Sequence, residues 1–564
     1  MPVGELDYIV VGAGTAGCVL ANRLSADPAT RVAVLEAGDD ALPGTEHVSV
    51  RDPYPISLNH PEFSWPDLVA EISAATQGRG PRVARPFLQG RGVGGSSNIH
   101  GMIALRASPE DYDGWSASGA AGWGWAQVLP FFRLLENDLD FTGPAHGHQG
   151  LMPVRRVMPE EWAPFSAAFG AVVREFGHAL ISDLNTDFRA GLGSLPMSNW
   201  PHQRVSAAMA YLDRATRRRP NLLLLANAFV EYVITDGRRA TGVLARTPAG
   251  RQTFTAREVI LCAGGIHSAA ILMRSGIGPA RHLRDHGIQV VCDLPGVGQR
   301  LMNHPQLQIA VHLPLHARQP RAQRAMNQNC LRFSSGVMDC PENDMLLVSL
   351  NKTAWHPLGR SIGALVVSVR RPFSHGEVRL NSADPAIAPT VKFNALSDSR
   401  DLERLAQGLR LCLSLLLHPR MAAMRNEVFV PNGERARTLG RGTIGNWLRS
   451  AAIRTLLEVA PLRRALLGAS ILDVPRVIED SEALRELVRT RVQLSHHVSC
   501  TCRMGDPGES GVVLDPRCRV LGMDGLRVID ASVMPTLVGA NPFLTVLMIA
   551  EKMAAEITRS ELAV

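Results

Sequence analysis

The amino-acid sequence predicts an α/β fold whose first part is a dinucleotide-binding domain of the Rossmann type. Residues 8–11 form a short run rich in β-branched side chains, as a buried parallel strand requires. The spacing G-x-G-x-x-G follows at Gly12, Gly14 and Gly17, and residues 16–26 continue with the pattern of a helix. A second strand-like run, residues 31–38, carries Glu36 about twenty residues past the glycines. Strand, glycines, helix, strand and acidic residue thus arrive in the order of a mononucleotide-binding unit.

Each glycine of this motif has a separate mechanical reason. Gly12 allows a tight turn, Gly14 lets the backbone approach a pyrophosphate, and Gly17 lets the helix pack against the strand. The helix N-terminus offers free N–H groups and the positive end of the helix dipole to phosphates. Glu36 can accept from ribose hydroxyls, which favours an adenosine without a 2′-phosphate. The motif therefore predicts an adenine dinucleotide, without separating FAD from NAD.

A second glycine-rich segment lies within residues 85–115. Gly90, Gly92, Gly94 and Gly95 precede two serines and form a loop with little side-chain bulk, after which a strand-like run resumes. Such a loop lets backbone N–H groups approach an anion or a flat ring closely. The alternative is a flexible surface loop, but the apolar residues directly after it indicate that it is attached to a core.

The segment 494–505, "LSHHVSCTCRMG", sets two histidines beside a C-x-C pair. His496, His497, Cys500 and Cys502 raise the question of zinc, but C-x-C is not a common zinc spacing and no second ligand pair stands out. A cysteine nucleophile is the other reading, yet nothing nearby would lower a thiol pKa. We therefore predict no metal site here, and we interpret both cysteines as small buried residues.

Four segments, taken in order along the chain, carry a family resemblance. They are residues 10–38, residues 90–115, residues 258–305 and residues 495–554. In these segments the sequence resembles the glucose–methanol–choline (GMC) family of FAD-dependent oxidoreductases. The resemblance implies that the dinucleotide is FAD.

The resemblance also implies two domains that alternate along the chain. The FAD-binding domain would comprise residues 1–150, 219–312 and 493–564, the last part including the catalytic histidine segment. A substrate-binding domain would comprise residues 151–218 and 313–492. Strand-like runs in residues 364–394 fit the antiparallel substrate-domain sheet of the family, and residues 399–419 fit a helix that covers it.

Two residues take catalytic places in the family motifs. His497 matches the histidine of H-x-x-(G/C)-T-C, in a form similar to that of choline dehydrogenases, and Asn541 matches a position that holds the substrate oxygen. A neutral imidazole suits removal of a hydroxyl proton while hydride leaves for flavin N5, and an amide can donate to the developing alkoxide. The alternatives are a buried structural histidine and an asparagine that only makes a turn before proline.

The resemblance further implies a set of cofactor-binding residues. These are Gly12, Gly14, Thr15, Ala16, Glu36, Ala37, Arg91, Gly94, Gly95, Ser96, Asn98, His100, Gly101, Val230, Asp530, Ala531, Asn541 and Pro542. His100 departs from the family, which usually has asparagine there, and could donate to the flavin or only fill space. Covalent members commonly use a histidine where this chain has Ile99, so we expect non-covalent FAD. Asn303 stands where relatives often have aspartate.

We therefore expect an enzyme that oxidises an alcohol to a carbonyl compound, more in the manner of a dehydrogenase than of an oxidase. Oxygen, a quinone and another carrier all stay open as electron acceptors. A composition rich in alanine and arginine, with few lysines, is also similar to that of mycofactocin-associated GMC dehydrogenases. The alternative is a non-redox relative that keeps FAD, similar to a hydroxynitrile lyase or a photodecarboxylase. A non-catalytic FAD-binding scaffold is less consistent with the His497–Asn541 pair.

Composition limits the partners. The net charge of +7 is spread along the chain without a dense basic block, so we expect no nucleic-acid partner. Scattered cysteines and the lack of a signal-peptide pattern predict a cytoplasmic protein. Residues 442–478 are apolar and basic, and could lie on a membrane surface, dock a partner or pack on the core. An aromatic content of 5% makes an aromatic cage for choline itself doubtful.

Overall fold

The first sheet has seven strands, and those at its centre run parallel. The computed structural model describes residues 6–73, 84–431 and 433–562. β1 (Leu6–Val11) pairs on one side with β2 (Val32–Leu35) and on the other with β14 (Gly250–Leu261). Every residue of β2 is buried, because both faces of this sheet are covered. The other strands are β11 (Leu222–Leu225), β12 (Phe229–Asp236), β13 (Arg239–Thr247) and β26 (Leu526–Val528). The Rossmann-type domain is confirmed.

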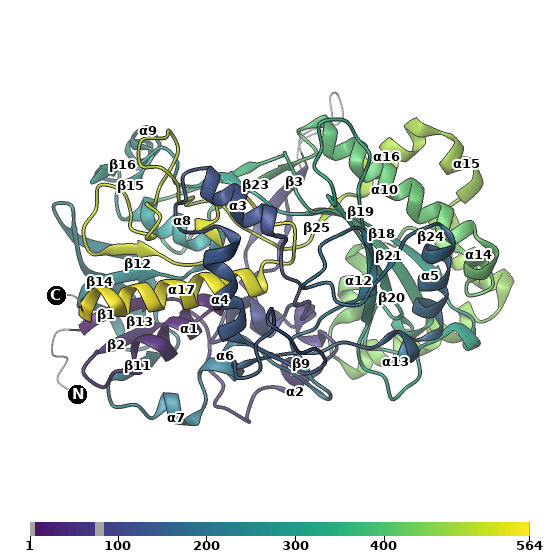
Figure 1. Cartoon of the computed structure of the whole chain (residues 1–564), viewed down its shortest axis with the longest axis horizontal. Coiled ribbons are helices and arrows are strands. Elements are labelled where there is room, and N and C mark those ends of the chain that lie inside the picture. Colours follow the sequence, from purple (N-terminus) through teal and green to yellow (C-terminus); the bar gives the residue numbers. More distant parts are fainter. Residues whose placement is uncertain (1–5, 74–83, 432, 563–564) are drawn as a thin grey trace.

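The C-terminal part of the chain completes this first domain. β26 pairs in parallel with β14, and α17 (Phe543–Leu562) packs against α1 (Thr15–Leu24), as Figure 1 shows. Arg23 on α1 donates two hydrogen bonds of 2.8 Å to Glu551 on α17. The domain is therefore discontinuous in sequence, and its first and last helices are joined by a buried carboxylate.

The second sheet has eight strands in the order β24-β18-β21-β20-β19-β8-β7, with β25 beside β18. All its pairs are antiparallel except β7–β8, as predicted for the first part of residues 364–394, whereas residues 376–379 and 390–394, expected in the same sheet, pair in another one. The strands are β7 (Leu180–Ile181), β8 (Gly191–Ser194), β18 (Pro305–His312), β19 (Asn327–Phe333), β20 (Met345–Leu350), β21 (Ile362–Val369), β24 (Val428–Phe429) and β25 (Gln493–Leu494).

Side chains alternate across the central strands of this sheet. On one face, apolar residues of β18, β20 and β21 form a core with α5 (Pro164–Glu175) and α10 (Ser399–Leu417): Leu307, Ile309, Leu347, Leu365 and Val367. On the other face, residues at the intervening positions line a cavity: Gln306, Gln308, Leu346, Val348, Leu350, Val366 and Ser368. The period of two thus gives the sheet one face for the helices and one for the site.

A third, five-stranded sheet joins distant parts of the chain. It comprises β17 (Gln299–Leu301), β22 (Gly376–Arg379), β23 (Thr390–Ala395), β3 (Val69–Ser73) and β4 (Ala84–Pro86). The structure differs from the predicted division of the chain here and in β18. Residues 305–312 were expected in the dinucleotide-binding part but pair with β21, because their alternate apolar side chains lie under α10. Residues 69–73, expected in the same part, pair with β23.

Residues 433–491 form helices on the outer side of the second domain. They are α12 (Gly433–Gly440), α13 (Ile444–Leu457), α14 (Ala460–Leu467), α15 (Val474–Glu479) and α16 (Ser481–Arg491). The stretch 442–478 is therefore several short helices, since Pro461 starts α14 and Gly468, with φ 45°, ends it. Within the described ranges, no helix combines the length and the apolarity needed to cross a bilayer.

Most of the remaining helices cover the first domain and its junction with the second, whereas the last of them, α11 (Pro419–Ala422), packs against α5 and α10. They are α2 (Val48–Arg51), α3 (Pro109–Ala117), α4 (Trp125–Leu135), α6 (Ala207–Tyr211), α7 (Arg214–Arg217), α8 (Gly264–Arg274), α9 (Ala280–Asp285) and α11 (Pro419–Ala422).

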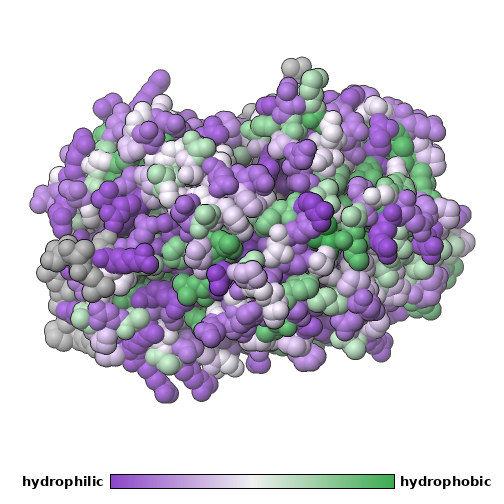
Figure 2. All heavy atoms as spheres, in the orientation of Figure 1, coloured by the Kyte–Doolittle hydropathy of each residue, from purple (hydrophilic) through white to green (hydrophobic). Residues whose placement is uncertain are grey.

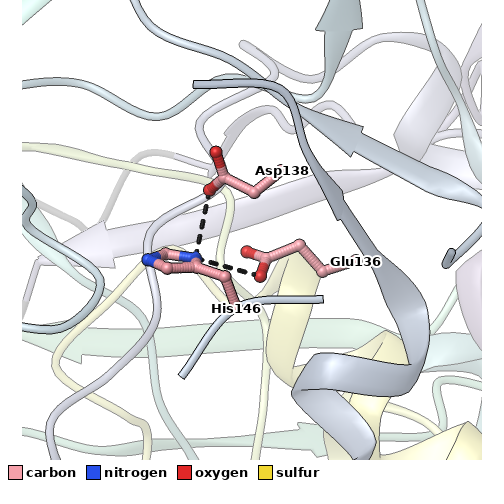
Figure 3. A group of neighbouring side chains, drawn as sticks. All are labelled: Glu136, Asp138 and His146. Carbon is pink, nitrogen blue, oxygen red and sulfur yellow. Dashed lines mark hydrogen bonds and ion pairs between the residues drawn. The ribbon is translucent and has the colours of Figure 1, made fainter. Parts of the chain in front are cut away.

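A buried ionic cluster lies beside β5 (Glu136–Asp138) and β6 (Met152–Val154). His146 contacts the carboxylates of Glu136, Asp138 and Asp183 at 3.0–3.3 Å, two of which are drawn in Figure 3. These partners raise the pKa of His146 to about 11 against the effect of burial, so the imidazole is charged. Arg106 and Arg156 bind the same carboxylates. Since cations already occupy the cluster, we interpret it as a structural ion-pair network and not as a metal site.

Candidate active site

A cavity of about 610 Å³ lies between the first sheet and the second. The carboxyl ends of β1, β2 and β14 form one wall, through Gly12, Glu36 and Cys262. The opposite wall is the face of the second sheet that carries Gln306, Gln308 and Val348. Open α/β sheets bind ligands at the carboxyl ends of their strands, and this volume is typical of a ligand pocket.

The first glycine loop leaves room for a ligand at one position. A Cβ on Gly12 would lie 2.8 Å from the Cys262 carbonyl oxygen, and one on Gly17 would overlap Gly12 itself. A Cβ on Gly14, by contrast, would meet only the Cys262 oxygen, at 3.9 Å. The N-terminus of α1 has no side-chain cap, and Thr15 and Ala16 line the cavity beside it. Open space at Gly14 and uncapped N–H groups are what a pyrophosphate needs.

Glu36 holds the two glycine loops together. Its carboxylate accepts from the backbone N–H groups of Ala13, Gly38 and Gly92 at 2.8–2.9 Å. Glu36 also lines the cavity, together with Ala37. The ribose contact stays a prediction, and the structure adds a loop-tying role.

The second glycine loop divides into residues on the cavity and residues behind it. Gly95, Ser96, His100 and Gly101 line the cavity, whereas Arg91, Gly94 and Asn98 do not. The residues behind shape the loop: Arg91 donates to the Ala37 carbonyl at 2.8 Å, Asn98 to the Val93 carbonyl at 2.8 Å, and the Gly94 N–H to the Ala13 carbonyl at 2.8 Å.

His100 lines the cavity and has one buried ring nitrogen without a partner. Its Nδ1 accepts from the Met102 N–H at 3.2 Å and from Arg204 Nη1 at 2.9 Å, so in the neutral ring the proton lies on Nε2. Burial, with the nearby Arg204 charge, lowers the His100 pKa to about 3, which keeps the ring neutral. Nε2 has no partner among the described residues. A buried donor without an acceptor indicates that a ligand supplies one.

A pair of histidines fixes the proton position on His497. His304 Nε2 lies 3.0 Å from the Val538 carbonyl oxygen, which can only accept, so His304 Nδ1 carries no proton. His497 Nδ1 lies 2.7 Å from this Nδ1 and must donate to it. The second nitrogen of His497, Nε2, is therefore an unprotonated acceptor. Burial, and then the charge of Arg370, holds the His497 pKa well below its usual range, so the ring is a free base at neutral pH.

Asn541 faces this acceptor. Its Nδ2 lies 3.3 Å from His497 Nε2, while its Oδ1 accepts from Arg370 Nη2 at 3.1 Å. Arg370 also donates to the Gly539 carbonyl at 3.1 Å, so the amide orientation is fixed by a buried guanidinium. The result is an acceptor and a donor side by side at the cavity surface. An alcohol oxygen there could donate its proton to one and accept from the other.

The residues predicted near the C-terminus to bind the cofactor line the cavity. Asp530, Ala531, Asn541, Pro542 and, from β12, Val230 all line the cavity. Asp530 accepts from the Gly264 N–H at 2.8 Å and from the hydroxyls of Ser268 and Ser532 at 2.6 Å. Its carboxylate therefore holds the start of α8 against the segment after β26.

The neighbours of His497 differ in exposure. His496, with φ 61°, has its ring 4.6 Å from the Phe87 ring, while its side chain is exposed and lines the cavity. Cys500 and Cys502 are fully buried, and burial raises the pKa of both thiols. A protonated, inaccessible thiol is a poor nucleophile and a poor metal ligand.

Three residues of the site escaped sequence reasoning. His304 lies beside Asn303, whose Oδ1 accepts from the His497 N–H at 2.9 Å, so the "NHP" segment was the signal that could have identified it. Arg370 and Arg204 lie outside the motifs, and nothing in the sequence distinguishes them from other arginines.

The substrate side of the cavity carries no acidic side chain. Within the described part of the chain, its lining includes two carboxylates, Glu36 and Asp530, and both belong to the dinucleotide side. The wall formed by the second sheet consists of amides, a hydroxyl and aliphatic groups, and Arg370 and Phe543 also line the cavity.

Comparisons with known proteins agree with this geometry. Two family models, both described as GMC oxidoreductase, match residues 6–306 and 372–550. The chain is 37% identical over 558 residues to 5-(hydroxymethyl)furfural oxidase of Methylovorus sp. (strain MP688), covering 97% of this chain and 98% of that protein. It is 32% identical over 590 residues to mitochondrial choline dehydrogenase of Homo sapiens, covering 99% and 90%. Among solved structures, pyridoxine 4-oxidase from Mesorbium loti superimposes with a TM-score of 0.82 at 25% identity, covering 98% of this chain and 99% of that one.

Proposed function

Because the chain belongs to the GMC oxidoreductase family, we propose that it catalyses the FAD-dependent oxidation of an alcohol to a carbonyl compound. The observation that carries the proposal is the pair of His497 Nε2 and Asn541 Nδ2, an acceptor and a donor 3.3 Å apart at the cavity surface. The relatives named above act on alcohols according to their names, which supports the same chemistry.

The residues of the cavity fit FAD. The open space at Gly14 and the uncapped α1 would hold the pyrophosphate, and the unpartnered Nε2–H of His100 would donate to the flavin. Bound FAD would supply the acceptor for a hydride. We propose that it is held without a covalent bond, since Ile99 offers no nucleophilic atom where covalent relatives have histidine, and since His100 Nδ1 is engaged by Arg204.

The proton chemistry follows from the fixed tautomers. His497 Nε2 takes the proton of the alcohol hydroxyl, which His304 makes feasible by accepting from Nδ1–H. The Asn541 amide donates to the alcohol oxygen while negative charge develops on it, and Arg370 polarises that amide from behind. Removing such a base typically costs about 10²–10⁴ in rate, and removing such a donor about 10²–10³.

The substrate that this cavity supports best is an uncharged alcohol. A quaternary ammonium such as choline would be buried near Arg370, without a carboxylate on the substrate side to pair with it. The amides of Gln306 and Gln308 and the side chains of Val348 and Val366 suit a moderately polar, uncharged molecule.

We further propose a dehydrogenase, in which an acceptor other than oxygen takes the electrons. The support is the likeness of the His497 segment to choline dehydrogenases and the apolar helical surface described below. The relatives named above include both oxidases and a dehydrogenase, so the assay must decide this point.

One experiment tests these proposals in order. The FAD-loaded protein is mixed anaerobically with uncharged primary alcohols, 5-(hydroxymethyl)furfural among them, and with choline, while the flavin absorbance is followed. We expect bleaching by uncharged alcohols, at least tenfold faster than by choline, and its loss in His497→Ala. Absence of bleaching by every alcohol would favour a non-redox relative that keeps FAD. Admitting air and measuring peroxide, against turnover with a quinone analogue, then separates an oxidase from a dehydrogenase.

A further inference from the structure

Helices α13 and α14 expose apolar side chains where a surface helix normally exposes polar ones. Seven large hydrophobic residues between positions 444 and 466 are exposed: Ile444, Trp447, Leu448, Leu456, Val459, Leu462 and Leu466. We call these seven residues the apolar helix face. The exposed fraction reaches 82% for Ile444 and 58% for Leu448, so these side chains do not belong to a core. A group of exposed apolar residues of this size is typical of a binding surface.

On α13, the buried residues and the most exposed apolar residues lie on opposite sides of the helix. Asn446, Ser450 and Leu457 are buried and define the side of the helix that contacts the protein. Ile444 and Leu448 lie on the opposite side and are exposed. The helix therefore buries two polar residues together with Leu457 and exposes large apolar residues on the side that faces away from the protein.

Positive charge surrounds the apolar helix face. Residues 441–467 contain five arginines and one glutamate. Arg463 is buried and, with Arg464, pairs with Glu427, and the glutamate, Glu458, is engaged by Arg318 at 2.7 Å and Arg454 at 3.5 Å. Arg441 and Arg449 are exposed and make no ion pair within the described ranges. The surface thus offers apolar groups and free guanidiniums, with no free acid.

We propose that the apolar helix face binds the surface of an anionic lipid bilayer. Aliphatic and tryptophan side chains would enter the boundary between headgroups and acyl chains, and the arginines would contact lipid phosphates. A second copy of the chain is a poorer occupant. In a twofold interface this face would meet itself, so that arginines would approach arginines without acids to pair with them.

The position of the apolar helix face in the molecule agrees with binding to a bilayer. α13 and α14 lie at the end of the molecule farthest from the chain termini, where a planar surface can reach them (Figure 1). The face of the molecule drawn in Figure 2 is mainly hydrophilic, with hydrophobic residues gathered in separate places. Just before α13, Gly440 packs on Asn59, which lines the cavity. A bilayer bound at α13 would therefore lie next to one wall of the cavity.

The test is co-sedimentation of the FAD-loaded full-length protein with lipid vesicles. One set of vesicles is pure phosphatidylcholine, and the other contains about one-third phosphatidylglycerol. We expect binding to the anionic vesicles, weak binding to the neutral ones, and a marked loss at about 0.5 M salt. Leu448→Glu should lower the partition coefficient at least tenfold, and Arg441→Gln and Arg449→Gln about fivefold each.

Leu42→Glu is the matched control, because Leu42 is 63% exposed, similar to Leu448, but lies far from α13 in the sequence and in no helix. It should bind like the unmodified protein. No binding to anionic vesicles, equal binding to both kinds, or equal loss in both leucine variants would each overturn the proposal. So would analytical ultracentrifugation showing a dimer that Leu448→Glu dissociates, because the face would then be a self-interface. Flavin absorbance confirms that every variant is folded.

Discussion

Replacing His304 with leucine tests whether one buried hydrogen bond sets the position of the proton on His497, the proposed base. Leucine fills a similar volume but cannot accept from His497 Nδ1–H, which now lies 2.7 Å from the His304 nitrogen. A buried N–H without an acceptor costs about 1–3 kcal/mol. The His497 ring can avoid this cost by moving its proton to Nε2, where it can no longer take a proton from the alcohol. The productive tautomer, and with it the rate, should therefore fall about 5- to 150-fold.

The assay is the rate constant of anaerobic flavin bleaching at a saturating concentration of alcohol, measured by stopped flow. Flavin content per protein is measured in parallel, since the Val538 carbonyl also loses its donor. His304→Gln is the control, because its amide oxygen can accept from His497 and its amide nitrogen can donate to Val538. We expect this variant to recover most of the rate. A leucine variant that bleaches at the original rate would refute the reasoning, because the tautomer of His497 would not depend on His304.

Four further expectations follow from the site and the core. Asn541→Ala should slow flavin bleaching about 10²–10³-fold, measured in the same apparatus, and a change below threefold would contradict its role as donor. Because the pKa of His497 is lowered, its ring is unprotonated at every pH above that lowered pKa. The rate of flavin bleaching should therefore stay level from pH 8 down through 6.5. A fall in rate centred near pH 6.5 would be inconsistent with a lowered pKa. Acid precipitation should release all yellow colour into the supernatant, whereas a yellow pellet would indicate a covalent flavin. His146→Leu should lower the free energy of unfolding by about 3–5 kcal/mol in urea titrations, since it leaves buried carboxylates without a cation. The pKa of His146 is raised to about 11 in the folded state, so the stability that its charge contributes is complete below about pH 6.5 and is lost as the pH rises towards 11. A free energy of unfolding that increases over that pH range would disprove the assignment.

The sequence was most informative where a local pattern has one physical meaning. Gly12 and Gly17 are required by close backbone approaches that only glycine permits, so their spacing identified the turn and the helix correctly. The alternation in β18 and β21 and the period of α10 follow equally from burial on one side. The histidine motif brought His497 and Asn541 to the same cavity, although 43 residues separate them in the sequence.

What the sequence did not predict depends on contacts between distant segments. Arg370 donates to Asn541 and Arg204 donates to His100, and such pairs of distant residues produce no periodic pattern in the sequence. β18 was expected in the wrong domain because a run of eight residues does not show which sheet it joins. Glu36 was expected to bind ribose, but its ties to three backbone N–H groups become visible only in the folded loops. The likeness to mycofactocin-associated dehydrogenases stays a prediction.

The packing of α1 against α17 determines when the ligand cavity can be completed during synthesis. β1 and α1 leave the ribosome well before β26 and α17, which complete their sheet and cover α1. Asp530, which holds the start of α8, and Asn541 also come from this final segment. Contacts of such long sequence separation form late, because the closure entropy of the intervening chain must be overcome first. The nascent protein must therefore keep an unfinished site until residues 526–562 have been made, and only then are all the walls of the cavity in place.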